Sequence, residues 1–151
     1  MASLSEVITK LTNIENAVDD ALNTEVADVV KDAIVESART NVYDVYEPKF
    51  LHRRNGNGGI LDKNAIEIEV RDNKLTAKST QAGVKGPKGW QQLLGGNVPS
   101  GRLAEAIASG EKRFNMNRAG PRPYHEDAEQ RVVADGSVED ALKRGMARQG
   151  Y

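Results

Sequence analysis

Apolar residues recur at three- and four-residue steps through the first part of the chain, which is typical of one face of a helix. The recurring positions are Leu4, Val7, Leu11, Ile14, Val18, Ala21 and Leu22, then Val26, Val29, Val30, Ala33 and Ile34. Asn23 and Thr24 are poorer helix formers, so we expect a break or kink near 22–25. Whether 4–46 is one bent helix or a helix pair is left open, and we expect its apolar stripe to face the core. The helix must end before Pro48.

A period of two replaces this pattern after a glycine-rich stretch. Ile66, Ile68 and Val70 alternate with Glu67 and Glu69, which predicts a strand with one buried and one wet face. Arg71 to Lys74 reads as a turn, and a second alternation follows it through Leu75, Ala77 and Ser79. The sequence therefore predicts an antiparallel β-hairpin, with Glu67 and Glu69 opposite Lys74 and Lys78.

The remainder alternates loops with shorter helices. Glycine and proline predict flexible loops at 55–59 and 80–101. A short helix is expected over 103–108, a helix over 125–134 with Ala128, Val132 and Val133 inward, and a final helix capped by Ser137. Residues 148–151 are expected to fray. The fold class is α+β in a single domain, 1–151: a long N-terminal helix or helix pair, a hairpin or small sheet, a short helix, C-terminal helices and long flexible loops.

The composition limits the kinds of site and the cellular setting that we expect for this chain. The chain has 38% hydrophobic and 28% charged residues and no cysteine, so disulfides and thiolate metal sites are excluded. Its apolar runs are too short for a membrane span, and its start lacks the features of a signal peptide. We therefore expect a protein made in a cytoplasm, or an assembly formed there, with no membrane partner.

Charge is distributed unevenly although the net charge is only −1. The segment 1–50 carries net −6, 51–125 carries +7 and 126–151 carries −2. This asymmetry is either the chance charge of solvated faces or a sign that an acidic element of one copy meets a basic element of the next. The basic middle lacks interleaved aromatic residues, so dedicated DNA binding is weakly supported.

The chain shows no recognisable catalytic apparatus. His52 and His125 lie far apart in polar stretches without metal-ligand spacing, so we interpret both as surface histidines. The run Arg53 to Gly59 is not a phosphate-binding loop, because it follows a helix and lacks the required Lys-Ser/Thr pair. It is either a surface loop or a mobile inter-subunit arm, and Trp90 is either a clip onto the core or an interface anchor. We expect no enzyme activity, cofactor or metal.

Several short motifs in a fixed order suggest a family. The junction reads Tyr46-Glu47-Pro48-Lys49-Phe50, then Arg53-Arg54 and Ile60-Leu61-Asp62, and it precedes the hairpin. A helix ending in Ser109-Gly110 follows, and Arg122-Pro123-Tyr124 opens the last helices. Over roughly 25–134 this resembles the minor-tail or tail-completion (head–tail joining) proteins of long-tailed bacteriophages and prophages. The loop 80–101 and the extended last helix depart from the family pattern.

The resemblance implies a structural virion protein. Such subunits form a homo-oligomeric ring, sixfold or a multiple, at the head–tail interface or proximal tail end. Neighbours would be head-closure or connector proteins and tail-terminator or tail-tube proteins, with phage DNA passing through the lumen without sequence-specific binding. The alternatives are a non-virion phage-encoded binding protein, such as an inhibitor or a nucleic-acid-associated accessory factor, and a small enzyme. Candidate assembly residues are Arg53, Arg54, Asn55, Gly56, Asn57, Gly58, Gly59, Trp90, Arg122 and Tyr124.

Overall fold

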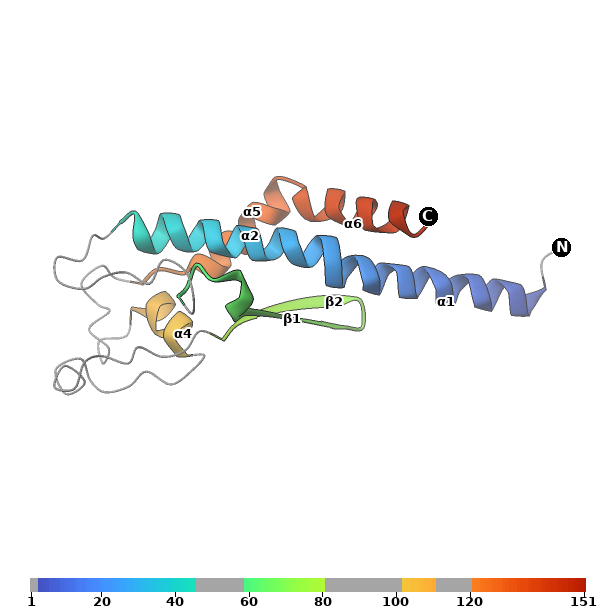
Figure 1. Cartoon of the computed structure of the whole chain (residues 1–151), viewed down its shortest axis with the longest axis horizontal. Coiled ribbons are helices and arrows are strands. Elements are labelled where there is room, and N and C mark those ends of the chain that lie inside the picture. Colours follow the sequence, from blue (N-terminus) through green and yellow to red (C-terminus); the bar gives the residue numbers. More distant parts are fainter. Residues whose placement is uncertain (1–2, 46–58, 81–101, 111–120) are drawn as a thin grey trace.

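A computed structural model describes residues 3–45, 59–80, 102–110 and 121–151. The chain is mostly helical with one two-stranded sheet, which confirms the α+β class. In Figure 1 the N-terminal helical segment runs along most of the molecule, with the last helix on one side and the hairpin on the other. The elements are α1 (Leu4–Ala21), α2 (Ala27–Ala38), β1 (Ile66–Arg71), β2 (Lys74–Ser79), α4 (Arg102–Ser109), α5 (Tyr124–Ala134) and α6 (Ser137–Arg148).

The N-terminal segment is one continuous helical rod rather than two separate helices. A π-helical turn, Leu22–Val26, joins α1 to α2, and a second one, Arg39–Tyr43, follows α2. The first lies at the predicted break. There the side chains of Asn23 and Thr24 donate hydrogen bonds back to the carbonyls of Asp19 and Asp20, at 2.9 and 2.7 Å. Hydroxyl and amide groups that bond back in this way are known to bend helices without ending them.

The start of α1 is well defined. Ser3 is the N-cap, and its hydroxyl accepts a hydrogen bond from the Glu6 backbone N–H, while the Glu6 carboxylate accepts one from the Ser3 N–H. This reciprocal capping box satisfies two backbone donors that a helix start leaves free. The helix therefore has a stable end at a point far from the rest of the molecule (Figure 1).

The hairpin has the predicted strands. Its register pairs Ile66 with Ser79 and Arg71 with Lys74, and a two-residue turn joins the strands. Asp72 and Asn73 in that turn both have positive φ, 51° and 57°. Glu67 lies opposite Lys78 as predicted; the other predicted pairing is wrong, because Glu69 faces Thr76 and Lys74 faces Arg71.

The C-terminal helices match the expected positions with two corrections. Of the three residues expected to face inward, Ala128 and Val132 do so, whereas Val133 points outward and is 76% exposed. Ser137 is not the cap of α6: Gly136 holds that position with φ 71°, and the Asp135 carboxylate accepts from the Ser137 N–H. In the tail that is expected to fray, 148–151, Arg148 is the last residue of α6, and Arg148 and Gln149 both bond to Asp20.

Two hydrophobic clusters hold these layers together. One joins the middle of the rod to the base of the hairpin, α4 and α5, through Ile34, Ala38, Ile60, Ile66, Ile107, Tyr124 and Ala128. The other joins the π-helical turn to α6 and the tip of the hairpin, through Leu22, Val26 and Ala141 with half-buried Val18, Val70, Leu75 and Leu142. The rod is therefore covered on two sides from about Ala17 onward.

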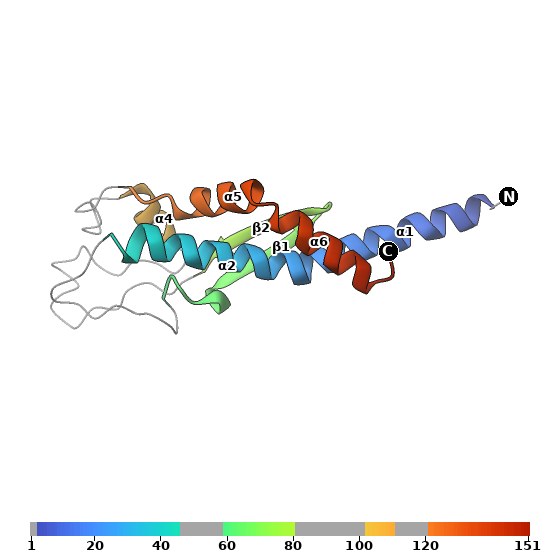
Figure 2. The same ribbon diagram turned by 90° about the horizontal axis from the view of Figure 1, so that it is seen from above.

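The first part of α1 lies outside both clusters. In Figures 1 and 2 it extends beyond the end of α6 and beyond the turn of the hairpin. Leu4 is 77% and Leu11 61% exposed, and Val7, Ile8 and Ile14 are exposed as well. The expectation that this stripe is core is therefore wrong for residues 4–14, because no other described element reaches them.

Candidate functional site

Most of the predicted assembly residues cannot be placed. Arg53, Arg54, Asn55, Gly56, Asn57, Gly58 and Trp90 lie outside the described residues, as do all but the last residue of the predicted loop 55–59 and all but the first residue of the predicted loop 80–101. Gly59 is buried, and its carbonyl accepts a hydrogen bond from the Asp62 N–H at 3.0 Å. Gly59 therefore belongs to the packed entry into the hairpin.

The motif Arg122-Pro123-Tyr124 fastens α5 to the subunit. The Arg122 N–H donates to the carbonyl of Ala108 at the end of α4, at 3.0 Å. Tyr124 has 0% exposure and packs in the cluster with Ile66 and Ile107, and burial raises its pKa to about 12. The Tyr124 side chain thus serves the interior of the subunit, so it is not available to a neighbouring copy in this conformation.

His125 and Ser79 form a hydrogen-bonded pair, 3.0 Å between Nε2 and Oγ. His125 is half-buried, unlike the predicted surface histidine, and burial lowers its pKa. A serine beside a neutral histidine can be the core of a nucleophilic site. Ser79, however, is only 5% exposed at the end of β2, so its hydroxyl is closed to an external substrate. The pair joins the hairpin to α5.

A polar network connects α2 to α5. The hydroxyl of fully buried Ser37 donates to the Asp127 carboxylate at 2.5 Å. The same oxygen accepts from Asn41 at 2.9 Å and from Arg131 at 2.8 Å. These donors, the Ser37 hydroxyl foremost, lower the pKa of Asp127. The Asp127 carboxylate thus accepts from three side chains of its own subunit, which favours a structural role.

The end of α6 is fastened to α1 by charge and by close contact. The Arg148 guanidinium bonds to Asp20 at 2.8 Å and to Glu25 at 2.9 Å. The Gln149 amide donates to Asp20 at 2.5 Å. Gly145 lies directly against Ala21. These contacts fix where the cover over α1 stops, and the exposed stripe begins there.

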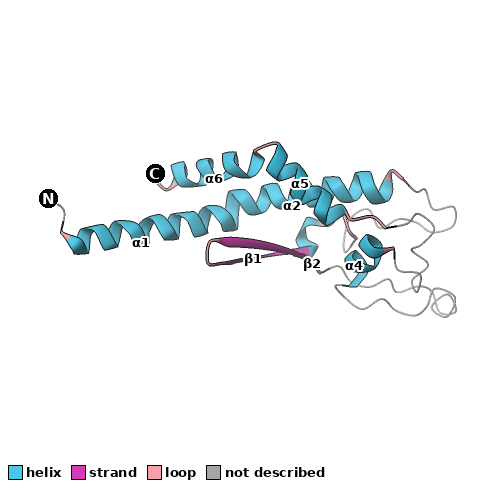
Figure 3. Ribbon diagram, turned by 180° about the vertical axis from the view of Figure 1, so that it is seen from behind, coloured by secondary structure: helices cyan, strands magenta, loops and turns pink. Residues whose placement is uncertain are grey.

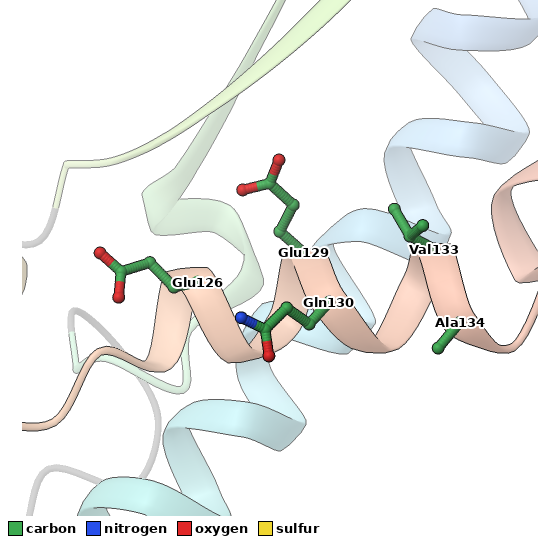
Figure 4. Close-up of a pocket in the computed structure, with 5 residues that line it drawn as sticks. All are labelled: Glu126, Glu129, Gln130, Val133 and Ala134. Carbon is green, nitrogen blue, oxygen red and sulfur yellow. The ribbon is translucent and has the colours of Figure 1, made fainter.

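A shallow depression lies on the outer face of α5. Figure 4 shows its lining, Glu126, Glu129, Gln130, Val133 and Ala134, all of which come from that single helix. One helix cannot enclose a small molecule, and convergent polar groups from a second element are absent from this lining. The depression is therefore a weak candidate for a ligand site.

The projecting part of α1 is the strongest candidate. Its exposed apolar residues share one side, whereas Thr9 and Thr12 turn their hydroxyls onto the carbonyls of Ser5 and Ile8. Large apolar side chains gathered on one exposed face usually mark an interaction surface. The sequence reasoning missed this site because periodicity identifies an apolar face without identifying what covers it. The signal in the sequence that could have revealed this surface is the regular alternation of three- and four-residue steps between the apolar residues of α1.

Two kinds of feature are absent from the described part of the chain. Within it, no group of three or more His, Asp or Glu side chains is arranged to hold a metal ion. No helix in the same ranges combines the length and the hydropathy needed to cross a membrane. The exposed apolar face itself makes the projecting part of α1 a candidate surface for contact with another macromolecule.

Comparison with known proteins identifies the family of the chain. The YomN family model matches residues 3–148, nearly the whole chain. No curated protein and no solved structure matches the chain.

Proposed function

Since the chain belongs to the YomN family and is a phage-associated protein, we propose that it is a structural virion subunit. It forms a ring at the head–tail interface or proximal tail end and joins the tail to the DNA-filled head. Its neighbours are a head-closure or connector protein on one side and a tail-terminator or tail-tube protein on the other. Its role is structural and not catalytic.

The projecting apolar face of α1 is the observation that carries this proposal. Leu4, Val7, Leu11 and Ile14 remain exposed on a helix whose start is firmly capped. A subunit acting alone gains nothing from such a face, whereas an assembling subunit buries it at a contact. A second line of support is the resemblance to head–tail joining proteins. It rests on the order of the junction, the hairpin and the Arg122-Pro123-Tyr124 segment along the sequence.

The charge distribution agrees with a ring. The acidic segment 1–50 and the basic segment 51–125 give each copy two oppositely charged regions. Neighbouring copies related by rotation bring unlike surfaces together, and opposite charge favours that arrangement. The proposed site of action is the virion, with assembly in the cytoplasm of the host bacterium and DNA passing through the lumen.

Deletion of the gene from the phage tests the proposal. We expect filled heads and separate tails that fail to join, and restoration of complete particles when the intact gene is supplied in trans. Mass spectrometry of purified particles should detect the protein. Normal infectious particles from the deletion phage would contradict the proposal.

The alternative is a non-virion binding or inhibitor protein encoded by the phage. Its motivation is the basic middle segment of the chain. The same experiment separates the two: absence from purified particles, combined with DNA affinity that falls steeply with salt, would favour the alternative.

A further inference from the structure

The exposed stripe of α1 has the spacing of a coiled-coil seam. Leu4, Val7, Leu11, Ile14 and Val18 are separated by steps of three, four, three and four. This is the alternation of a and d positions in a heptad, which keeps one seam facing a partner helix. Val18 marks its inner end, because it already packs in the cluster under α6 and the hairpin tip.

We infer that this stripe, Leu4–Ile14, binds the same stripe of a second copy of the chain, with the two α1 helices parallel and in register. The inference deepens the proposed ring and rests on it, since it identifies the surface through which copies meet. The partner is another copy because the charges that flank the seam complement themselves.

Charge complementarity selects the parallel arrangement. With Leu4 at position a, Lys10 occupies a g position and Glu15 the next e position, five residues later. In a parallel pair, g of one helix meets the following e of its partner, so each Lys10 meets a Glu15 of the other copy. In an antiparallel pair, g meets g, and the two Lys10 side chains repel each other. Both residues are exposed in the subunit.

The surroundings of the seam fit the same arrangement. Ile8 lies at the e position between Val7 and Leu11 and widens the apolar stripe, which suits contact with more than one neighbouring helix. Beyond Val18 the cover of α6 and the hairpin forces the partner helices to diverge. Figure 3 shows the helix leaving this cover at its N-terminal end.

The length of the seam sets its strength. It comprises about two heptads, which is short for a helix pair that must associate alone. The contact is therefore weak between two free subunits and gains strength when several copies are held together in a ring. A trapping experiment suits such a contact, because a crosslink accumulates even from a weak complex.

Single-cysteine variants provide the trap, because the native chain has no cysteine. Under mild oxidation of the purified full chain, Leu4→Cys and Leu11→Cys should each form disulfide-linked dimers, since equal positions meet in a parallel seam. Thr9→Cys, on the outer face of the same helix, is the matched control and should remain monomeric. A crosslink only in a mixture of Leu4→Cys with Ile14→Cys would show an antiparallel pair and overturn the inference, as would no crosslink at any position.

Charge reversal supplies a second arm. Adding Lys10→Glu to Leu4→Cys should lower the crosslinking rate about fivefold, and adding Glu15→Lys as well should restore it. Each variant should keep its circular dichroism and melting temperature, because both side chains are exposed. Faster crosslinking with Lys10→Glu alone would contradict the parallel seam.

The experiments distinguish a failure of the proposed seam from a failure of the proposed virion role. Disulfide trapping with the protein absent from purified particles would leave the seam standing and overturn only the virion role. Presence in particles without trapping, either in solution or in the particles, would overturn only the seam. Leu11→Glu, introduced into the phage gene, should reduce incorporation into particles while the isolated subunit stays folded.

Discussion

Gly145 packs against Ala21 so closely that a Cβ at Gly145 would overlap the Ala21 side chain and lie 2.9 Å from its Cα. This contact brings α6 against α1 and sets the end of the covered part of the rod. In a free helix, glycine is about 1 kcal/mol worse than alanine. Gly145→Ala should nevertheless lower stability, because the added methyl forces the two helices apart.

Thermal or denaturant unfolding of Gly145→Ala measures this effect. We expect a loss of about 1–3 kcal/mol, the usual cost of overpacking. Ala147→Gly, at an exposed position two residues away, is the matched control and should lose only about 1 kcal/mol from helix propensity. A gain of stability in Gly145→Ala would show that the helices are not in close contact there.

The turn of the hairpin offers a stabilising substitution. Asp72 and Asn73 both occupy the left-handed region, as a type I′ turn requires. Glycine adopts that conformation at less cost than asparagine, whereas a β-branched residue adopts it poorly. Asn73→Gly should therefore raise stability by up to about 0.5 kcal/mol and Asn73→Val should lower it by about 1 kcal/mol or more. The order of the melting temperatures, glycine above asparagine above valine, checks both.

The same hairpin shows what the sequence can predict. Alternation at Ile66, Ile68 and Val70, then at Leu75 and Ala77, reflects a local period that the strand geometry imposes. An irregularity of the helix near 22–25, where the π-helical turn lies, was also predictable, because Asn23 and Thr24 carry the groups that compete for backbone carbonyls. Such features depend on neighbours in the chain.

Features that depend on distant contacts were not predictable. The apolar stripe of α1 reads the same from Leu4 to Val18, but the end of α6 decides that only its inner part is covered. His125 pairs with Ser79 across 46 positions. Nothing in the residues around His125 marks it as half-buried, since its polar neighbours suit a surface as well. The candidate site could be found only from the tertiary structure, because it is an apolar helix face that no other described element covers.

The network around Asp127 predicts a strong effect on stability. Asp127→Ala leaves the hydroxyl of fully buried Ser37 without its acceptor and removes the charged partner of Arg131. An unsatisfied buried hydroxyl costs about 1–3 kcal/mol. Glu129→Ala, two residues along α5 and exposed, is the matched control and should change the free energy of unfolding by less than about 0.5 kcal/mol. Equal effects of the two substitutions would contradict a structural role for the network.

His125 predicts a distinct dependence of stability on pH. Burial lowers its pKa below the ordinary histidine value of 6.5, so the folded protein favours the neutral ring more than the unfolded chain does. As pH falls, the unfolded chain therefore takes up the proton on this histidine at a higher pH than the folded protein does. The stabilisation that the neutral ring gives above the unfolded pKa is lost as pH falls from that value through the folded pKa. Melting temperature should decline between about pH 7 and about pH 5.

His125→Gln isolates this contribution, because glutamine keeps a hydrogen-bonding group toward Ser79 but does not titrate. The variant should be less stable than the native chain at neutral pH, since its amide packs less well beside Tyr124. Its decline between about pH 7 and about pH 5 should be shallower than that of the native chain. The lowered pKa of Asp127 affects stability in a separate pH window, below the ordinary aspartate pKa of 3.8. Parallel melting curves for the native chain and the variant across the histidine range would show that His125 does not carry the pH dependence.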